Sequence, residues 1–276
     1  MKKLILSLTI AGLFTTAHAQ IKTPAPSPSQ TVKQEFGLSN IELTYSRPAV
    51  KGRKIFGDLV PNNAVWRTGA NGATTLTFGE NVIIGGKEVP AGKYGLLTIP
   101  AAGSWTIIIS KQTDVTSPSA YKLDQDVVRV SAKVKPLATR VENFTIGFDN
   151  VKAESLDLGI SWDKSVVVLP IKVNIDEKIM ASIDASMKSE KPAYFQAAVY
   201  YMETGKDVKQ AATWLAKAVD AQPSAFWVQY QYARSLAKLG KNGMAKEVAL
   251  KSKELAAAAK NQDYVTLNDK LIAGLK

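Results

Sequence analysis

The chain has 276 residues and a formal net charge of +11, with one histidine and no cysteine. A chain without cysteine has no disulfides, no thiol nucleophile and no cysteine-linked lipid anchor. Without Lys2 and Lys3, the excess positive charge is +5 up to Ile175 and +4 after it, whereas nucleic-acid-binding proteins concentrate it on one face or tail. We therefore expect no nucleic-acid partner.

Residues 1–19 have the pattern of a secretory signal peptide. Two lysines near the start precede an apolar stretch from Leu4 to Phe14, and residues 17–19 form an A-x-A cleavage site. The apolar part is too short to span a membrane, and no later stretch has the ~18 uncharged apolar residues that a span needs. We predict cleavage between Ala19 and Gln20 and a mature chain that is periplasmic or secreted.

Cleavage would also remove His18, the single histidine. A mature chain without histidine and cysteine cannot use Ser-His-Asp or Cys-His catalysis, and it cannot build a metal site from imidazole or thiolate. We predict no metal and no other cofactor, and this composition favours a non-enzymatic role.

The order of the elements predicts a leader and then a β-rich domain. Residues 20–30 hold three prolines among small polar residues and predict an extended leader. From residue 31 to residue 175, apolar and polar residues alternate in short runs such as NIELTYS, separated by turn residues that include Gly85–Gly86. This pattern predicts an antiparallel β-sandwich with a jelly-roll-like arrangement.

Helical periodicity begins after the β domain. Residues 176–190 predict a helical connector with two acids at its start, where the helix dipole favours negative charge. Within residues 191–276, Ala198 and Gly205 recur 35 residues later, and AAVYYMETGKDVKQAATWLAKAVDAQP resembles a tetratricopeptide unit. The final YVTLNDKLIAGLK predicts a capping helix. The resemblance implies that these repeats bind a protein partner.

The segment from Ser46 to Phe78 carries most of the excess charge of the first half, with five basic residues and one acid. Pro48 restricts the residue before it to extended conformations, so Arg47 would leave the end of a strand with little backbone freedom. Trp66 and Arg67 would point to opposite faces of a strand. Guanidinium, amide and hydroxyl groups suit carboxylates, sulfates, phosphates or sugar hydroxyls. The candidate ligand-binding residues are Arg47, Arg53, Arg67, Asn71, Ser46, Lys51 and Thr74.

Other candidate chemistry has less support. The segment Gly86–Gly92 has the wrong spacing for a phosphate-binding loop, and Asp124 and Asp126 lack the glycine and glutamate of a calcium loop. A Ser–Lys dyad needs no histidine, but Ser110–Lys111 would point apart on a strand, and Ser46 and Lys51 have only their residue types in favour. The simpler interpretation of the basic segment is that Arg and Lys stems cover apolar surface.

The run YSRPAVKGRKIFGDLVPNNAVWRTGANGATTLTF, together with GKEVPAGKYGLLTIP and WTIIISK, resembles the bacterial domain of unknown function 2911 family. The resemblance covers residues 31–173. Members of this family are exported proteins, mostly from gram-negative bacteria, so the resemblance implies an exported protein, and it implies no agreed activity. It also implies that Arg47, Arg53, Arg67 and Asn71 are signature positions. A functional groove around them is therefore favoured, since a scaffold rarely needs several specified arginines.

Three functions are compatible with these observations. The leading hypothesis is a periplasmic binding or assembly protein whose arginine-rich groove holds a polar or anionic envelope ligand, such as a glycan. The alternatives are a hydrolase or isomerase that uses carboxylates and lysines, and a purely structural envelope protein. Two carboxylates about 5–10 Å apart in one cleft would favour the hydrolase. Arginines, amides and aromatics in one cleft would favour binding, and arginines paired with acids would favour the structural role.

Overall fold

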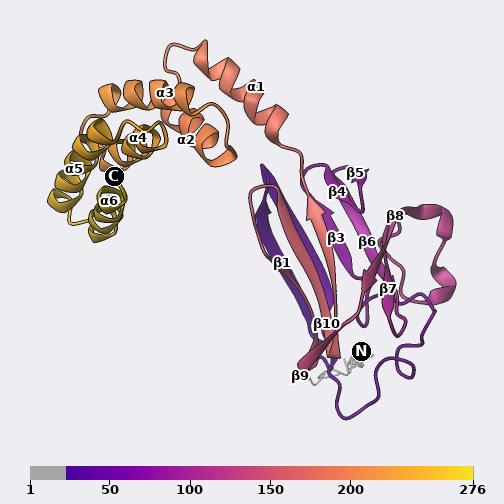
Figure 1. The fold of residues 1–276 in the computed structure, drawn as a ribbon. Coiled ribbons are helices and arrows are strands. Elements are labelled where there is room, and N and C mark those ends of the chain that lie inside the picture. The colour runs from indigo at the N-terminus through magenta and orange to yellow at the C-terminus, as the bar shows by residue number, and fades with distance from the viewer. Residues whose placement is uncertain (1–22, 276) are drawn as a thin grey trace, which may run out of the picture. The chain divides into compact units, whose positions relative to one another are not determined.

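The computed structural model describes residues 23–275 and contains two compact units, one ending at Asn174 and the other beginning at Ile175 (Figure 1). Within that range the first unit is built from antiparallel strands and the second from six α-helices, which confirms the predicted β domain followed by a helical region. The predicted signal peptide, residues 1–19, and its cleavage site lie outside the described residues.

Two antiparallel sheets form the β unit. The strands of the larger sheet are, in spatial order, β1 (Ser29–Phe36), β2 (Ser39–Ser46), β3 (Thr75–Phe78), β6 (Gly92–Ile99), β7 (Ser104–Ser110) and β8 (Asp126–Lys133). Those of the smaller sheet are β5 (Lys87–Val89), β4 (Val82–Ile84), β10 (Ser155–Lys172) and β9 (Lys135–Asp149). The sheets pack face to face, with β10 against β7 and β8.

The alternation of apolar residues determines which face of each strand is buried. On β2, Ile41, Leu43 and Tyr45 are buried, and the residues between them are partly exposed. Burial of apolar surface stabilises the fold by about 25 cal/mol for each Å² removed from water. The core also contains large aromatic residues from several strands, including Trp105 of β7 and Trp162 of β10. The sandwich core is therefore rich in rings at the end where β2 and β9 meet.

Strand β9 is an edge strand, so alternate residues direct their backbone groups away from β10. Buried backbone groups of this kind need partners. The hydroxyl of Tyr45 is the partner of both backbone groups of Ile146. It donates to the carbonyl oxygen at 2.9 Å and accepts from the amide N–H at 3.0 Å. One hydroxyl of the larger sheet thus closes the edge of the smaller one.

The second unit is a series of helices in sequence order. They are α1 (Asp176–Met187), α2 (Tyr194–Thr204), α3 (Val208–Ala221), α4 (Phe226–Lys238), α5 (Asn242–Ala258) and α6 (Gln262–Gly274). Ala198, Ala211, Ala233 and Ala245 are fully buried, as expected where helices cross at close range. Gly205 follows α2 in the left-handed conformation, with φ of 71°. The helix pairs are consistent with the tetratricopeptide resemblance. No helix among residues 23–275 has the length and apolar character that crossing a membrane requires.

Replacing Tyr45 by phenylalanine tests the link between the sheets. The change keeps the ring in the core but leaves the N–H and C=O groups of Ile146 without their partner. We expect the free energy of unfolding of the β unit to fall by about 1–3 kcal/mol, measured by urea unfolding with tryptophan fluorescence. Tyr94→Phe is the matched control because the Tyr94 hydroxyl donates one hydrogen bond, to the carbonyl oxygen of Pro90 at 2.9 Å. A loss for Tyr45→Phe no larger than that of the control would contradict the role of Tyr45.

Candidate functional site

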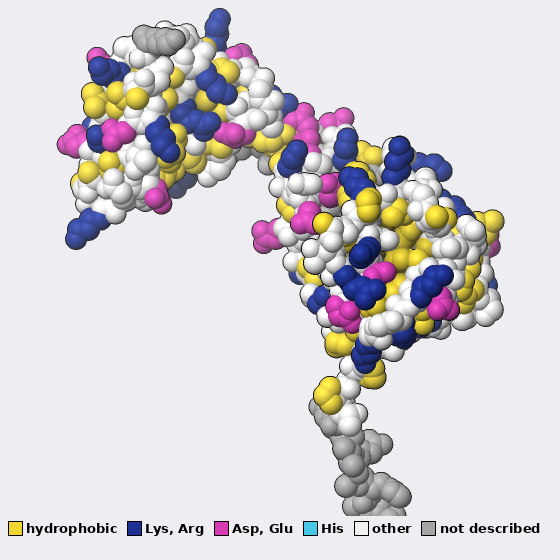
Figure 2. Space-filling view, turned by 60° about the horizontal axis from the view of Figure 1, so that its bottom comes forward, with side chains coloured by type: hydrophobic (Ala, Val, Ile, Leu, Met, Phe, Trp, Pro, Cys, Tyr) yellow, Lys and Arg dark blue, Asp and Glu magenta, His cyan; other side chains and the backbone are white. Residues whose placement is uncertain are grey.

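The connection between β2 and β3, residues 47–74, is attached to both sheets. On one side it is bonded to Glu142 and Phe144 of β9. Val50 N–H donates to the carbonyl oxygen of Glu142 at 2.8 Å, and Phe144 N–H donates to the carbonyl oxygen of Pro48 at 2.8 Å. On the other side, Trp66 and Thr98 of β6 exchange backbone hydrogen bonds of 2.7 and 3.0 Å. The connection therefore lies across one end of the sandwich. Figure 2 shows this side of the β unit, where Lys and Arg side chains, with Asp and Glu among them, surround exposed apolar ones.

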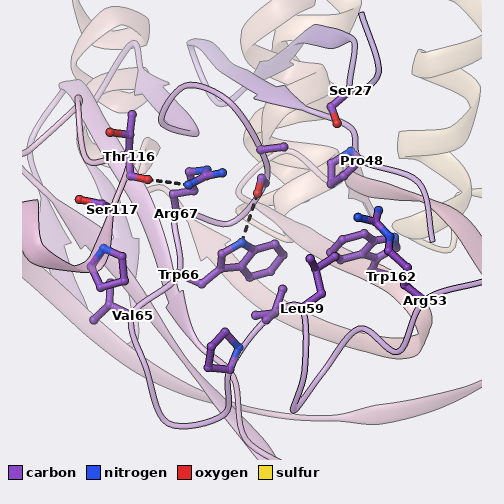
Figure 3. A pocket seen from close by; sticks show the side chains of 15 residues that line it. Ser27, Pro48, Arg53, Leu59, Val65, Trp66, Arg67, Thr116, Ser117 and Trp162 are labelled. Carbon is purple, nitrogen blue, oxygen red and sulfur yellow. Dashed lines mark hydrogen bonds between the residues drawn. The ribbon is translucent and has the colours of Figure 1, made fainter. Parts of the chain in front are cut away.

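A cavity of about 370 Å³ opens beneath this connection (Figure 3). Its walls come from four separate parts of the chain. They are Ser27, residues 48–70 of the connection, Thr116–Pro118 of the loop that follows β7, and Trp162 of β10. The lining residues are Ser27, Pro48, Arg53, Leu59, Val60, Pro61, Val65, Trp66, Arg67, Gly69, Ala70, Thr116, Ser117, Pro118 and Trp162.

Two tryptophans give the cavity a rigid aromatic wall. The rings of Trp66 and Trp162 are stacked, with centroids 5.9 Å apart and planes 12° apart. Each indole N–H is bound to a backbone carbonyl, that of Gly69 at 3.2 Å and that of Glu142 at 3.3 Å. Phe144 packs edge-on against both rings. The polar edges of both rings are thus already satisfied. Trp66 offers apolar surface to the cavity, and Trp162, which is 1% exposed, is stacked on it.

Two of the three arginines predicted for the site line this cavity, namely Arg53 and Arg67. Arg67 donates from Nη1 to the carbonyl oxygen of Thr116 at 2.5 Å, and its Nε is buried without an acceptor within residues 23–275. Arg53 donates from Nε and Nη2 to the carbonyl oxygens of Val50 and Ala49, at 3.1 and 2.5 Å. Neither forms an ion pair with a carboxylate in the described part of the chain.

The other predicted site residues lie outside the lining of the cavity. Arg47 donates to the carbonyl oxygen of Phe144 at 3.0 Å and to Thr145 Oγ1 at 2.8 Å. Ser46 is buried, with its hydroxyl 3.1 Å from that of Ser29, and Thr74 is buried and donates to the carbonyl oxygen of Thr68 at 2.7 Å. These three side chains hold the backbone on which the cavity is built.

Lys51 and Asn71 occupy turns of the connection. Both have left-handed backbone conformations, with φ of 47° and 57°. Lys51 is exposed, and its backbone N–H is bound to the carboxylate of Glu142 at 2.8 Å. Asn71 donates from its side chain to the carbonyl oxygen of Ser27 at 3.0 Å, so it positions a lining residue without lining the cavity itself.

A family model described as "Protein of unknown function (DUF2911)" matches residues 27–171. The chain belongs to the DUF2911 family. The match runs from Ser27 past Trp162, so every lining residue of the cavity falls inside it. No curated protein and no solved structure matches the chain.

Sequence reasoning missed three contributors to the site of this DUF2911 domain: Ser27, the Thr116–Pro118 wall and the role of Trp162. The Thr116 carbonyl oxygen and Trp162 lie 49 and 95 positions after Arg67 in the chain. A backbone carbonyl has no sequence signature. The alternation of apolar and polar residues on β9 and β10 indicated strands, and nothing local indicated that Trp162 borders a cavity.

The loop that carries Thr116, residues 111–125, is closed at its end by a polar cluster. Tyr121 donates to Asp126 Oδ2 at 2.5 Å, and Arg129 Nη1 lies 3.0 Å from the Tyr121 hydroxyl and 3.1 Å from the same carboxylate oxygen. Burial, followed by the hydrogen bond to Asp126 and its negative charge, raises the pKa of Tyr121 from 10.0 to about 12. The cluster therefore favours the neutral phenol. We call Tyr121, Asp126 and Arg129 the loop latch.

The alternative chemistries gain no support from the described residues. Within residues 23–275 no group of three or more His, Cys, Asp or Glu side chains is arranged to hold a metal ion. Asp126, considered earlier as a calcium ligand, belongs to the loop latch, and its partner Asp124 is exposed. Ser110 is buried, with its hydroxyl bound to the carbonyl oxygen of Gln125.

Tyr121→Phe tests the loop latch through its pH dependence. A folded-state pKa raised from 10.0 to about 12 stabilises the fold fully below pH 10, and that contribution is lost as the pH rises toward 12. We therefore expect the free energy of unfolding of the parent protein to fall more steeply than that of Tyr121→Phe between these pH values. Parallel stability curves for the two proteins would contradict this prediction. Asp126→Asn should give an intermediate slope, since burial of the phenol remains.

Proposed function

We propose that this protein is exported and that its β unit binds a small anionic molecule in the cavity without transforming it. The observation that carries the proposal is the pair Arg53 and Arg67. Both line one cavity, and neither is neutralised by a carboxylate within the described residues. Arg67 is partly removed from water and Arg53 is exposed. A cation without a counter-charge favours an anion beside it, the more so where it is partly removed from water. The volume is also in the range of ligand pockets, roughly 300–1,000 Å³.

The lining argues against the hydrolase and isomerase alternatives. Among the described residues that line the cavity there is no aspartate, glutamate or lysine. Glycosidase chemistry needs two carboxylates that flank the scissile bond, and lysine chemistry needs an amine that faces the substrate. Guanidinium groups are protonated at all physiological pH values, so they bind and polarise but do not exchange protons.

The structural alternative fits one arginine better than the others. Arg47 uses its guanidinium to satisfy β9 and lies outside the cavity, as a scaffold residue would. Arg67 leaves a buried Nε without an acceptor within residues 23–275, a cost of about 1–3 kcal/mol that a purely structural residue would not need to carry. Binding of an anion would offset it.

The helical unit adds a surface for a protein partner. A groove of about 620 Å³ is lined by α3, α4, the turn after α4 and the start of α5, and its apolar residues include Leu236 and Met244. Lys209, Lys217 and Lys241 line it together with one acid, Asp220. This charge balance suits a peptide segment that carries acidic residues next to an apolar one. The proposal is thus a ligand-binding β unit joined to a protein-binding helical unit.

A thermal-shift panel tests the binding proposal. The probes are sulfate, phosphate, acetate, benzoate and glucuronate, each at concentrations up to the solubility or stability limit. A ligand at about 100 times its Kd adds roughly 2.7 kcal/mol of stability, which corresponds to a rise in Tm of roughly 5–10 °C for a unit of this size. If no probe raises the Tm of the parent protein, the binding proposal is wrong.

Arg67→Ala identifies the site within the same panel. We expect the ligand-induced rise in Tm to disappear, while the Tm without ligand changes little because Arg67 makes one hydrogen bond to the protein. Arg140→Ala is the matched control, since Arg140 is paired with Asp163 at 2.7 Å and does not line the cavity. It should leave the ligand response intact. An unchanged response in Arg67→Ala would place the binding elsewhere.

A further inference from the structure

The three arginines of the β2–β3 connection use the same edge of the guanidinium in different ways. That edge carries the N–H groups of Nε and Nη2, which point in parallel and match the two oxygens of a carboxylate. In Arg47 the protein fills it, with Nε on the carbonyl oxygen of Phe144 at 3.0 Å and Nη2 on Thr145 Oγ1 at 2.8 Å. In Arg53 the carbonyl oxygens of Val50 and Ala49 fill it.

Arg67 differs because its Nε–Nη2 edge has no acceptor within residues 23–275. Its single hydrogen bond runs from Nη1, on the opposite side of the group, to the carbonyl oxygen of Thr116. Within residues 23–275, Nε is buried and has no acceptor, and no hydrogen bond is made by Nη2. The Thr116 carbonyl therefore fixes the orientation of the guanidinium of this cavity-lining residue (Figure 3). The edge that recognises oxyanions keeps no protein acceptor, and since Nε is shielded from solvent, an oxyanion reaches it by displacing the groups that cover it.

We propose that the cavity binds a carboxylate carried on an apolar ring, and that the Nε–Nη2 edge of Arg67 holds the carboxylate. This inference rests on the proposed function and narrows it to one ligand class. One open edge matches one planar carboxylate with two hydrogen bonds. A tetrahedral sulfate or phosphate needs further donors around it. The described lining offers few, namely the remaining N–H groups of Arg53 and the hydroxyls of Ser27, Thr116 and Ser117.

The rest of the lining determines the body of the ligand. Leu59, Pro61, Val65 and Trp66 present carbon surface to the cavity, and the buried Trp162 is stacked on Trp66. The indole N–H groups are already bound to carbonyl oxygens and are not available to sugar hydroxyls. A polyhydroxylated ring would lose hydrogen bonds to water that this surface does not replace. An apolar cyclic acid is therefore favoured over a uronic acid.

Calorimetric titration of the full chain with matched probes tests the ligand class. The probes are cyclohexanecarboxylate, benzoate, their neutral amides, glucuronate, and sulfate. We expect the two cyclic carboxylates to bind at least about 10-fold more tightly than the amides, glucuronate and sulfate, a difference that corresponds to one charged pair of hydrogen bonds. If glucuronate or sulfate binds more tightly, this inference is wrong while the proposed function stands. If no anion binds, both are wrong.

Two lysine substitutions test the assignment of the edge. Arg67→Lys keeps the positive charge but removes the fork, so we expect binding of cyclohexanecarboxylate to weaken at least about 10-fold. Arg140→Lys is the matched control, since Arg140 is paired with Asp163 at 2.7 Å and does not line the cavity. It should leave the affinity unchanged. Equal affinities of Arg67→Lys and the parent protein would overturn the role of the Arg67 edge. The comparison of acid with amide on the parent protein does not depend on how either variant folds.

Discussion

The hydrogen-bond requirement of the edge strand β9 organises this end of the β unit. Its outward-facing backbone groups lie at Glu142, Phe144 and Ile146, and they are bound by Val50, Pro48, Arg47 and the Tyr45 hydroxyl. An unpaired edge would leave these buried groups without partners or expose them to other chains. The connection after β2 must therefore run along β9 before it crosses to β6. The cavity is the space that this path leaves over the tryptophans.

Arginine has two different roles along the β2–β3 connection. Arg47 and Arg53 each turn the two-donor edge of the guanidinium toward the backbone, where a charged donor makes a stronger hydrogen bond than a neutral one. Arg67 is bound by its other side. The role of each arginine depends on which of its nitrogens donates to a backbone carbonyl oxygen. The net charge of the segment and its number of arginines give no information on this.

Features that depend on neighbours in the chain could be predicted from the sequence, and contacts between distant segments could not. Period-two alternation in runs such as that of β2 depends on neighbours within the same strand, and it predicted the sheets correctly. The 35-residue recurrence of small residues likewise indicated paired helices. The concentration of charge drew attention to the segment that crosses the cavity. The different roles of Arg67 and Arg47 could not be predicted from the sequence. Their hydrogen-bond partners, Thr116 and Phe144, lie 49 and 97 positions away in the chain.

The Thr116 carbonyl links the cavity to the loop latch. Thr116 belongs to the loop of residues 111–125, whose fold depends on Gln112 bridging to Ala120 and Lys122 and on Tyr121 bound to Asp126. Since that carbonyl is the acceptor that orients the Arg67 guanidinium, the direction of the open edge depends on the position of this loop. Arg67 is thus held between two independently anchored segments, the connection bonded to β6 and the loop that leads into β8. A side chain positioned from both sides loses little conformational entropy on binding, which favours a preformed site over one assembled by the ligand.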